Sequence, residues 1–87
     1  MGFKVIEIQP TPNPNALKFV LDHEISPSPA SYFAAASAVD DPVASRLFQI
    51  AGVASLLLLG DFVTVNKRPD AKWGGIKSKV ERILAEA

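Results

Sequence analysis

The sequence contains no cysteine among its 87 residues. Without a thiol the chain cannot form a disulfide, supply a thiolate nucleophile, or hold zinc or an iron–sulfur cluster through its own sulfur, so we expect no cofactor bound through cysteine. The net charge is zero, because nine basic side chains balance nine acidic ones. A neutral chain has no overall attraction to nucleic acid or to an anionic membrane, and we expect neither as a partner.

The sequence also has only short hydrophobic runs. The longest one, residues 53–59 with Ser55 inside it, is far shorter than the roughly 20 residues that a membrane-spanning helix needs. The first residues lack the basic start and apolar stretch of a secretory signal, so we expect a cytoplasmic protein. What remains is an ordinary globular composition, 48% hydrophobic and 21% charged, with no repeat or linker. The sequence therefore predicts a single domain over residues 1–87.

The first part of the chain favours strands. Residues 3–9 are rich in β-branched and aromatic side chains, and residues 16–21 alternate between apolar and polar, so both are predicted to be strands of one hairpin. Prolines at alternating positions of 10–15 exclude a helix between them. Residues 22–30 contain two further prolines and are predicted to be a surface loop. Residues 31–38 suit a helix or a short strand, and we favour the strand.

A helix is predicted after Asp40 and Asp41, whose carboxylates suit the N-cap position. Pro42 fits the first helical turn because its missing N–H has no helical partner there. Gly52 is the expected stop signal of this helix. The spacing thus predicts a helix that begins at Pro42 and ends before Gly52.

The rest of the chain predicts a hairpin and a second helix. Residues 53–59 and 62–66 are apolar strands joined by Gly60-Asp61, a two-residue turn with glycine first. Asp70 is expected to cap the last helix, whose first turn is expected to be irregular because it contains two glycines. The apolar face of that helix consists of Trp73, Ile76, Val80, Ile83 and Leu84.

These elements predict an α+β fold. The order is strand, strand, a possible short strand, helix, strand, strand, helix, which places two helices on one face of an antiparallel-dominated sheet.

Few residues suit catalysis or metal binding. The single histidine has no recognisable serine partner and the chain has no glycine-rich phosphate loop, so we do not expect an enzyme. Two acidic clusters offer oxygen and nitrogen ligands that suit a divalent metal ion. Consecutive side chains on an extended segment point in opposite directions, and helix capping explains the second cluster without a metal. The candidate ligands are Asp22, His23, Glu24, Asp40 and Asp41.

Charge is unevenly distributed along the chain. Residues 66–87 carry six basic and three acidic side chains, and residues 1–65 carry three basic and six acidic ones. A basic C-terminal end suits an acidic partner or a nucleic acid, but we favour the simpler interpretation of a solvated helix face.

The proline-rich connection between the first two strands is the remaining candidate site. Its prolines lower the entropy lost on binding, and its threonine and asparagines offer hydrogen-bond donors and acceptors. It is either a preorganised recognition edge or a loop that only fixes the hairpin. Its residues are Pro10, Thr11, Pro12, Asn13, Pro14 and Asn15.

Several motifs together resemble the N-terminal domain of Nfu-type iron–sulfur scaffold proteins over nearly the whole chain. The most specific is Gln9-Pro10-Thr11-Pro12-Asn13-Pro14-Asn15-Ala16-Leu17-Lys18-Phe19. Others are Pro42-Val43-Ala44 before Leu47-Phe48 and Gly52-Val53, then Gly60-Asp61-Phe62-Val63-Thr64-Val65 and Trp73 at the start of the final helix. Gly74-Gly75 departs from the family, which more often has helix-favouring residues there.

The resemblance implies an accessory role. In the family a second domain with a Cys-x-x-Cys motif holds the cluster, and that motif is absent from this sequence. We therefore expect a non-catalytic domain that supports iron–sulfur cluster assembly or delivery by contacting scaffold, carrier or target proteins through residues 10–15. The alternative is a weak iron-binding protein that uses its surface carboxylates and His23, since the family is also associated with iron.

Overall fold

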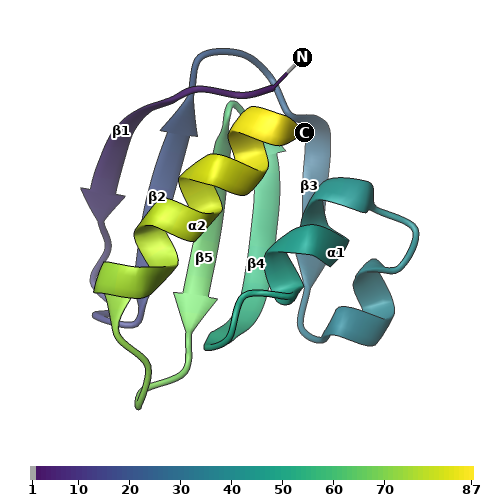
Figure 1. Ribbon diagram of the computed structural model, residues 1–87. Helices are drawn as coiled ribbons and strands as arrows, with labels where there is room; N and C mark the ends of the chain where they lie inside the picture. The colour runs from purple at the N-terminus through teal and green to yellow at the C-terminus, as the bar shows by residue number, and fades with distance from the viewer. Residues whose placement is uncertain (1) are drawn as a thin grey trace.

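A computed structural model describes residues 2–87 and shows a five-stranded sheet with two α-helices (Figure 1). The elements in chain order are β1 (Val5–Pro10), β2 (Ala16–Leu21), β3 (Ser26–Tyr32), a 3-10 helix η1 (Ala35–Ala38), α1 (Pro42–Phe48), β4 (Val53–Gly60), β5 (Phe62–Lys67) and α2 (Trp73–Glu86). The strands lie in the order β1-β2-β5-β4-β3, and every neighbouring pair is antiparallel.

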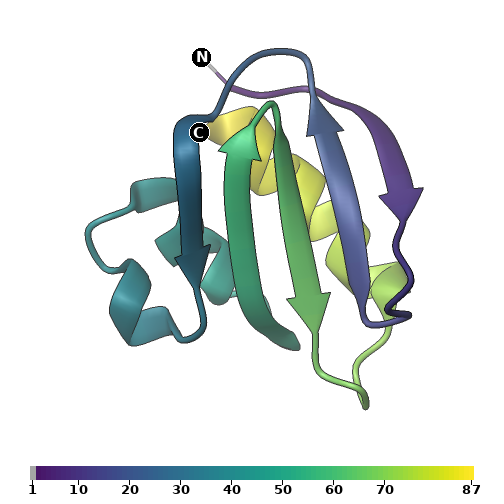
Figure 2. The same ribbon diagram turned by 180° about the vertical axis from the view of Figure 1, so that it is seen from behind.

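Both α-helices pack on the same face of the sheet. α2 crosses the strands diagonally and α1 lies beside it over β3 and β4, whereas the view from behind shows the other face without a helix in front of it (Figure 2). The predicted α+β class and its antiparallel sheet are confirmed. In the part of the chain that the structure describes, neither helix has the length and apolar character to span a membrane.

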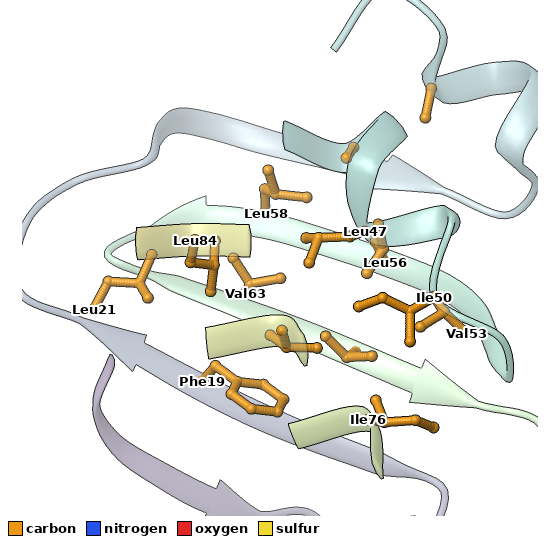
Figure 3. Packing of buried hydrophobic residues seen from close by; sticks show 14 residues of the cluster. Phe19, Leu21, Leu47, Ile50, Val53, Leu56, Leu58, Val63, Ile76 and Leu84 are labelled. Atoms are coloured by element: carbon orange, nitrogen blue, oxygen red, sulfur yellow. The ribbon is translucent and has the colours of Figure 1, made fainter. Parts of the chain in front are cut away.

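The core lies between the sheet and the helices (Figure 3). Alternate residues of β2, β4 and β5 point toward the helices, and α2 contributes one residue from each successive turn. This burial of apolar surface is the main stabilising term of a fold without disulfides. The largest fully buried side chains are Phe19, Leu21, Leu47, Leu56, Leu84, Val63, Val65 and Val80.

The first and last segments of the part of the chain that the structure describes also meet. The N–H of Phe3 donates to the carbonyl of Leu84 at 2.7 Å, so the segment before β1 lies against the last turn of α2. Both ends therefore lie at one end of the sheet, opposite the β1–β2 connection (Figure 1).

The prediction of a loop over residues 22–30 was wrong, because β3 begins at Ser26. Its prolines at positions 27 and 29 remove N–H groups, which an edge strand tolerates, and its pairing with β4 is irregular between Ser26 and Ala30. The strand favoured within residues 31–38 was only partly right. β3 ends at Tyr32, and residues 35–38 form η1.

The cap of α1 was predicted correctly and that of α2 was not. The Asp41 carboxylate accepts from the N–H groups of Val43 and Ala44, at 3.1 and 3.0 Å. α2 begins at Trp73 with Lys72 at the N-cap position and without a side-chain cap, so Asp70 does not cap it. The glycine-containing first turn of α2 is helical, contrary to the expected irregularity.

Candidate functional site

The connection between β1 and β2 is a tight loop stabilised by its own side chains. The Thr11 hydroxyl lies 2.8 Å from the carbonyl of Asn13 and 3.0 Å from that of Ala16, and accepts from the N–H of Asn13 at 3.1 Å. The Asn13 side-chain oxygen accepts from the N–H of Asn15 at 2.9 Å. Such side-chain contacts replace the backbone ladder where prolines interrupt it. Hydrogen bonds within the loop thus define its shape, and Pro12, Asn13 and Pro14 are exposed at its tip.

Two residues far away in the sequence hold this loop against the body of the domain. Lys67, the last residue of β5, donates its N–H to the Asn15 carbonyl at 2.7 Å and its ammonium group to the Asn15 side-chain oxygen at 2.9 Å. The indole N–H of Trp73, the first residue of α2, donates to the Pro14 carbonyl at 3.2 Å. The ring of Trp73 also packs against the core beside Phe19, with the ring centroids 6.4 Å apart. The loop is thus anchored to both β5 and α2.

The structure brings all six predicted loop residues into one connection, with Pro10 as the last residue of β1. It also assigns internal roles to the polar atoms of Thr11, Asn13 and Asn15. Sequence reasoning missed Lys67 as an anchor, and it assigned Trp73 only to the apolar face of the last helix. Neither has a local signal, because they lie 52 and 59 residues from their partners in the loop.

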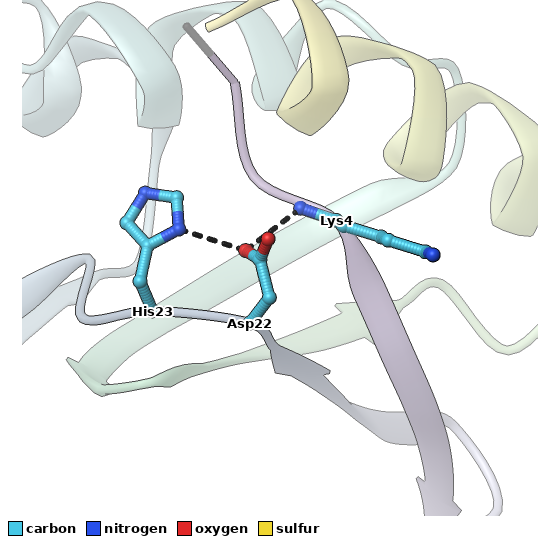
Figure 4. Close-up of polar contacts among 3 residues, drawn as sticks. All are labelled: Lys4, Asp22 and His23. Carbon is cyan, nitrogen blue, oxygen red and sulfur yellow. Dashed lines mark hydrogen bonds and ion pairs between the residues drawn. The ribbon is translucent and has the colours of Figure 1, made fainter.

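The first group of predicted metal ligands lies near the N-terminus (Figure 4). Nδ1 of His23 lies 2.7 Å from Oδ1 of Asp22, and the same carboxylate oxygen accepts from the backbone N–H of Lys4 at 3.1 Å. The hydrogen bond from Lys4, followed by the contact with His23, lowers the pKa of Asp22. The His23 ring stacks on that of Phe3, with centroids 4.4 Å apart. Glu24 is exposed and joins no polar contact within residues 2–87.

The second group, Asp40 and Asp41, lies at the start of α1. Asp41 caps the helix and accepts from the Tyr32 hydroxyl at 3.0 Å, which raises the pKa of Tyr32. Asp40 is exposed. Within residues 2–87 no three histidine or carboxylate side chains are grouped so that they could hold a metal ion.

By its fold and its anchored loop, the chain is a small α+β domain in which a proline–asparagine loop is fixed to the last helix. Residues 6–87 match the family described as "Scaffold protein Nfu/NifU N terminal", and the chain therefore belongs to this family. The resemblance noted in the sequence is confirmed.

Similar proteins agree with this assignment. The chain is 36% identical to an NFU1 iron-sulfur cluster scaffold homolog, mitochondrial, of Drosophila willistoni, and covers 29% of that protein with 93% of its own length. It is 34% identical to a NifU-like protein of Schizosaccharomyces pombe, covering 32% of that protein with 93% of its own length. The chain thus spans less than a third of the length of these curated relatives.

Solved structures share the fold. The solution structure of a NifU-like protein from Saccharomyces cerevisiae matches with a TM-score of 0.80 at 27% identity, over 92% of this chain and 74% of that one. The crystal structure of protein SAV1430 from Staphylococcus aureus matches with a TM-score of 0.77 at 31% identity, over 92% of this chain and 96% of that one.

Proposed function

We propose that this domain supports iron–sulfur cluster assembly or delivery without catalysis, by contacting cluster scaffold, carrier or target proteins through the loop of residues 10–15. Membership of the Nfu/NifU N-terminal family supports the cluster-related role. Since the sequence has no cysteine, its contribution would be protein contact and not sulfur ligation of the cluster.

The anchored loop is the observation that carries this proposal. A loop that hydrogen bonds hold to itself and to two other elements loses little conformational freedom when a partner binds. Its exposed tip combines the apolar surface of Pro12 and Pro14 with the amide of Asn13. A rigid tip with both kinds of surface suits recognition of another protein.

Replacing both Asn13 and Asn15 with alanine tests the proposal. We expect the double variant to remain folded, because neither residue belongs to the buried core, and to capture iron–sulfur scaffold, carrier and target proteins about tenfold less well. Capture is measured by quantitative pull-down with the purified domain, and folding by circular dichroism. The matched control is Pro27→Ala with Pro29→Ala, a pair of exposed residues on the opposite edge strand. Unchanged capture by the folded asparagine variant would contradict the proposal.

Trp73→Phe separates the shape of the loop from its chemistry. This variant keeps an aromatic ring against the core but removes the N–H that holds the Pro14 carbonyl, and it leaves the amino-acid sequence of the loop unchanged. If the fixed shape matters, Trp73→Phe lowers capture as well. Full capture by Trp73→Phe would show that the anchor on α2 is dispensable.

Iron binding is the alternative function, and the contact between Asp22 and His23 is the observation in its favour. These two side chains supply only part of a coordination shell, so water would have to complete it. Anaerobic titration with ferrous iron, followed by NMR, distinguishes the two functions. Line broadening confined to Asp22 and His23 supports iron binding, and its absence excludes this alternative.

A further inference from the structure

A basic groove lies between the two α-helices, and it shares no lining residue with the loop of residues 10–15. One hollow of about 340 Å³ lies between the segment after α1 and the first half of α2, where Arg68, Lys72 and Lys79 line it. A second hollow of about 300 Å³ continues along α2, and the cations that line it are Arg46, Lys79 and Arg82. The two hollows are adjacent, because Ile50 and Lys79 line both, and together they are called the groove below.

The groove has an excess of unpaired positive charge. Within residues 2–87 the ion pairs are His23–Asp22 and Arg46–Glu86. Five cations line the groove, and Arg46 is the one that takes part in an ion pair. The other four, Arg68, Lys72, Lys79 and Arg82, belong to neither pair. Those four side chains are exposed, whereas the acidic side chains that line the hollows are Asp70 and the Glu86 already paired with Arg46. Four unpaired cations on one groove therefore face a single unpaired carboxylate, although the whole chain is neutral.

The floor of the groove is apolar. Ile50 and Ile76 line the first hollow with only 5% and 3% of their surfaces exposed, and the half-buried Ile83 lines the second. A floor of this kind favours a ligand that carries carbon side chains as well as charge. The cations around it favour carboxylates and increase the rate of encounter with an acidic partner.

The start of α2 adds to the attraction for anions. Its first turn has no side-chain cap, so backbone N–H groups remain available at the positive end of the helix dipole. Gly75 lines the groove in this turn, and a Cβ atom built there would meet no atom within 4 Å. The absence of a side chain keeps the groove open next to Lys72.

We propose that this groove binds an acidic segment of a partner protein, in which Asp or Glu side chains alternate with apolar ones. Charge complementarity and the apolar floor support this ligand. A nucleic acid is less suited, because no aromatic side chain lines either hollow to stack with a base.

Binding of a short synthetic peptide of alternating glutamate and leucine tests the groove. NMR titration is expected to show saturable shifts at Gly52, Lys72, Gly75 and Lys79, weaker at high salt because charge contributes. A peptide with lysine in place of glutamate is expected not to bind. A lack of saturable shifts, or shifts confined to residues 10–15, would overturn the proposal. Tighter binding of a single-stranded oligonucleotide at the same salt concentration would overturn it in favour of nucleic acid.

Charge reversal distinguishes binding that depends on the groove cations from binding that depends only on the net charge of the domain. Lys72→Glu with Lys79→Glu reverses two groove cations, and the matched control Lys4→Glu with Lys77→Glu reverses two exposed lysines that line neither hollow. We expect the groove variant to bind the peptide about tenfold more weakly, and we expect the control variant to lose much less of its affinity for the peptide. Equal losses would show that only net charge matters. If the double groove variant fails to fold, Gly75→Glu places a carboxylate in the same groove where a Cβ has room.

Discussion

At the scale of single residues, Gly52 fixes the turn that joins α1 to β4. Its φ of +98° lies in the region that other residues rarely adopt, and a Cβ atom there would lie 2.7 Å from the Cβ of Ala71. Its carbonyl accepts from the N–H of Arg68 at 2.7 Å, so the turn is also tied to the segment after β5. Backbone conformation and close packing thus both require glycine at this position.

Gly52→Ala is expected to destabilise the domain by about 2 kcal/mol, because the left-handed conformation alone costs roughly 1–2 kcal/mol and the contact with Ala71 adds to it. Gly74→Ala is the matched control. Gly74 lies inside α2 without a positive φ and has room for a Cβ atom, so alanine there is expected to stabilise by about 0.5–1 kcal/mol. Urea unfolding of both variants measures these changes. A neutral Gly52→Ala would contradict the assigned backbone conformation.

The lowered pKa of Asp22 predicts that the stability of the domain depends on pH. Folding lowers its pKa below the ordinary value of 3.8, mainly through the hydrogen bond from Lys4, so its ionised form stabilises the native state. That contribution is present above pH 3.8 and is lost as the pH falls through the lower pKa of the folded state. We therefore expect Asp22→Asn to lower the melting temperature at pH 7 but to have a smaller effect near pH 3. Glu24→Gln is the control, and an effect of Asp22→Asn that does not change with pH would contradict the assignment.

At the scale of elements, α1 is a short helix whose stability depends on its N-cap. It has only seven residues, and helices this short are marginal without tertiary support. Asp41 satisfies two of its free N–H groups and accepts a third hydrogen bond from Tyr32 of β3. One carboxylate thus joins the edge strand to the start of the helix.

Asp41→Ala is expected to destabilise the domain by about 1–2 kcal/mol, the usual cost of losing an N-cap together with a side-chain hydrogen bond. Asp40→Ala, which removes an exposed neighbouring carboxylate, is expected to change stability by less than about 0.5 kcal/mol. Thermal unfolding compares the two variants. Equal effects would mean that local charge, and not the cap, stabilises this end of α1.

The elements also show what a sequence can predict. β2, β4 and β5 were recognised because their apolar side chains follow strand patterns over six to eight residues. β3 was missed because its prolines are local loop signals, whereas its strand geometry comes from pairing with β4 more than twenty residues away. The cap of α1 was found because Asp41 lies next to the helix that it caps. The anchors of the proline loop were not predicted, because Lys67 and Trp73 become neighbours of the loop only in the folded domain.

At the scale of the whole molecule, the two surfaces available for contact differ in kind. The loop of residues 10–15 is a projecting, uncharged tip held by hydrogen bonds, whereas the groove between α1 and α2 is concave and basic. A projecting tip suits a pocket on a partner, and a basic groove suits an extended acidic segment. The neutral total charge of the chain conceals this division, because it averages an acidic body with a basic C-terminal part.

Because residues 3 and 84 are in contact, the two ends of the domain are equivalent points for attaching it to a surface or to another protein. A reporter, a surface or another polypeptide joined at either end would be tethered at the same pole of the molecule. The proline loop lies at the opposite pole, so it would point away from the tether and remain accessible (Figure 1). Immobilisation through one end or the other should therefore give the same orientation and leave the same tip free for capture.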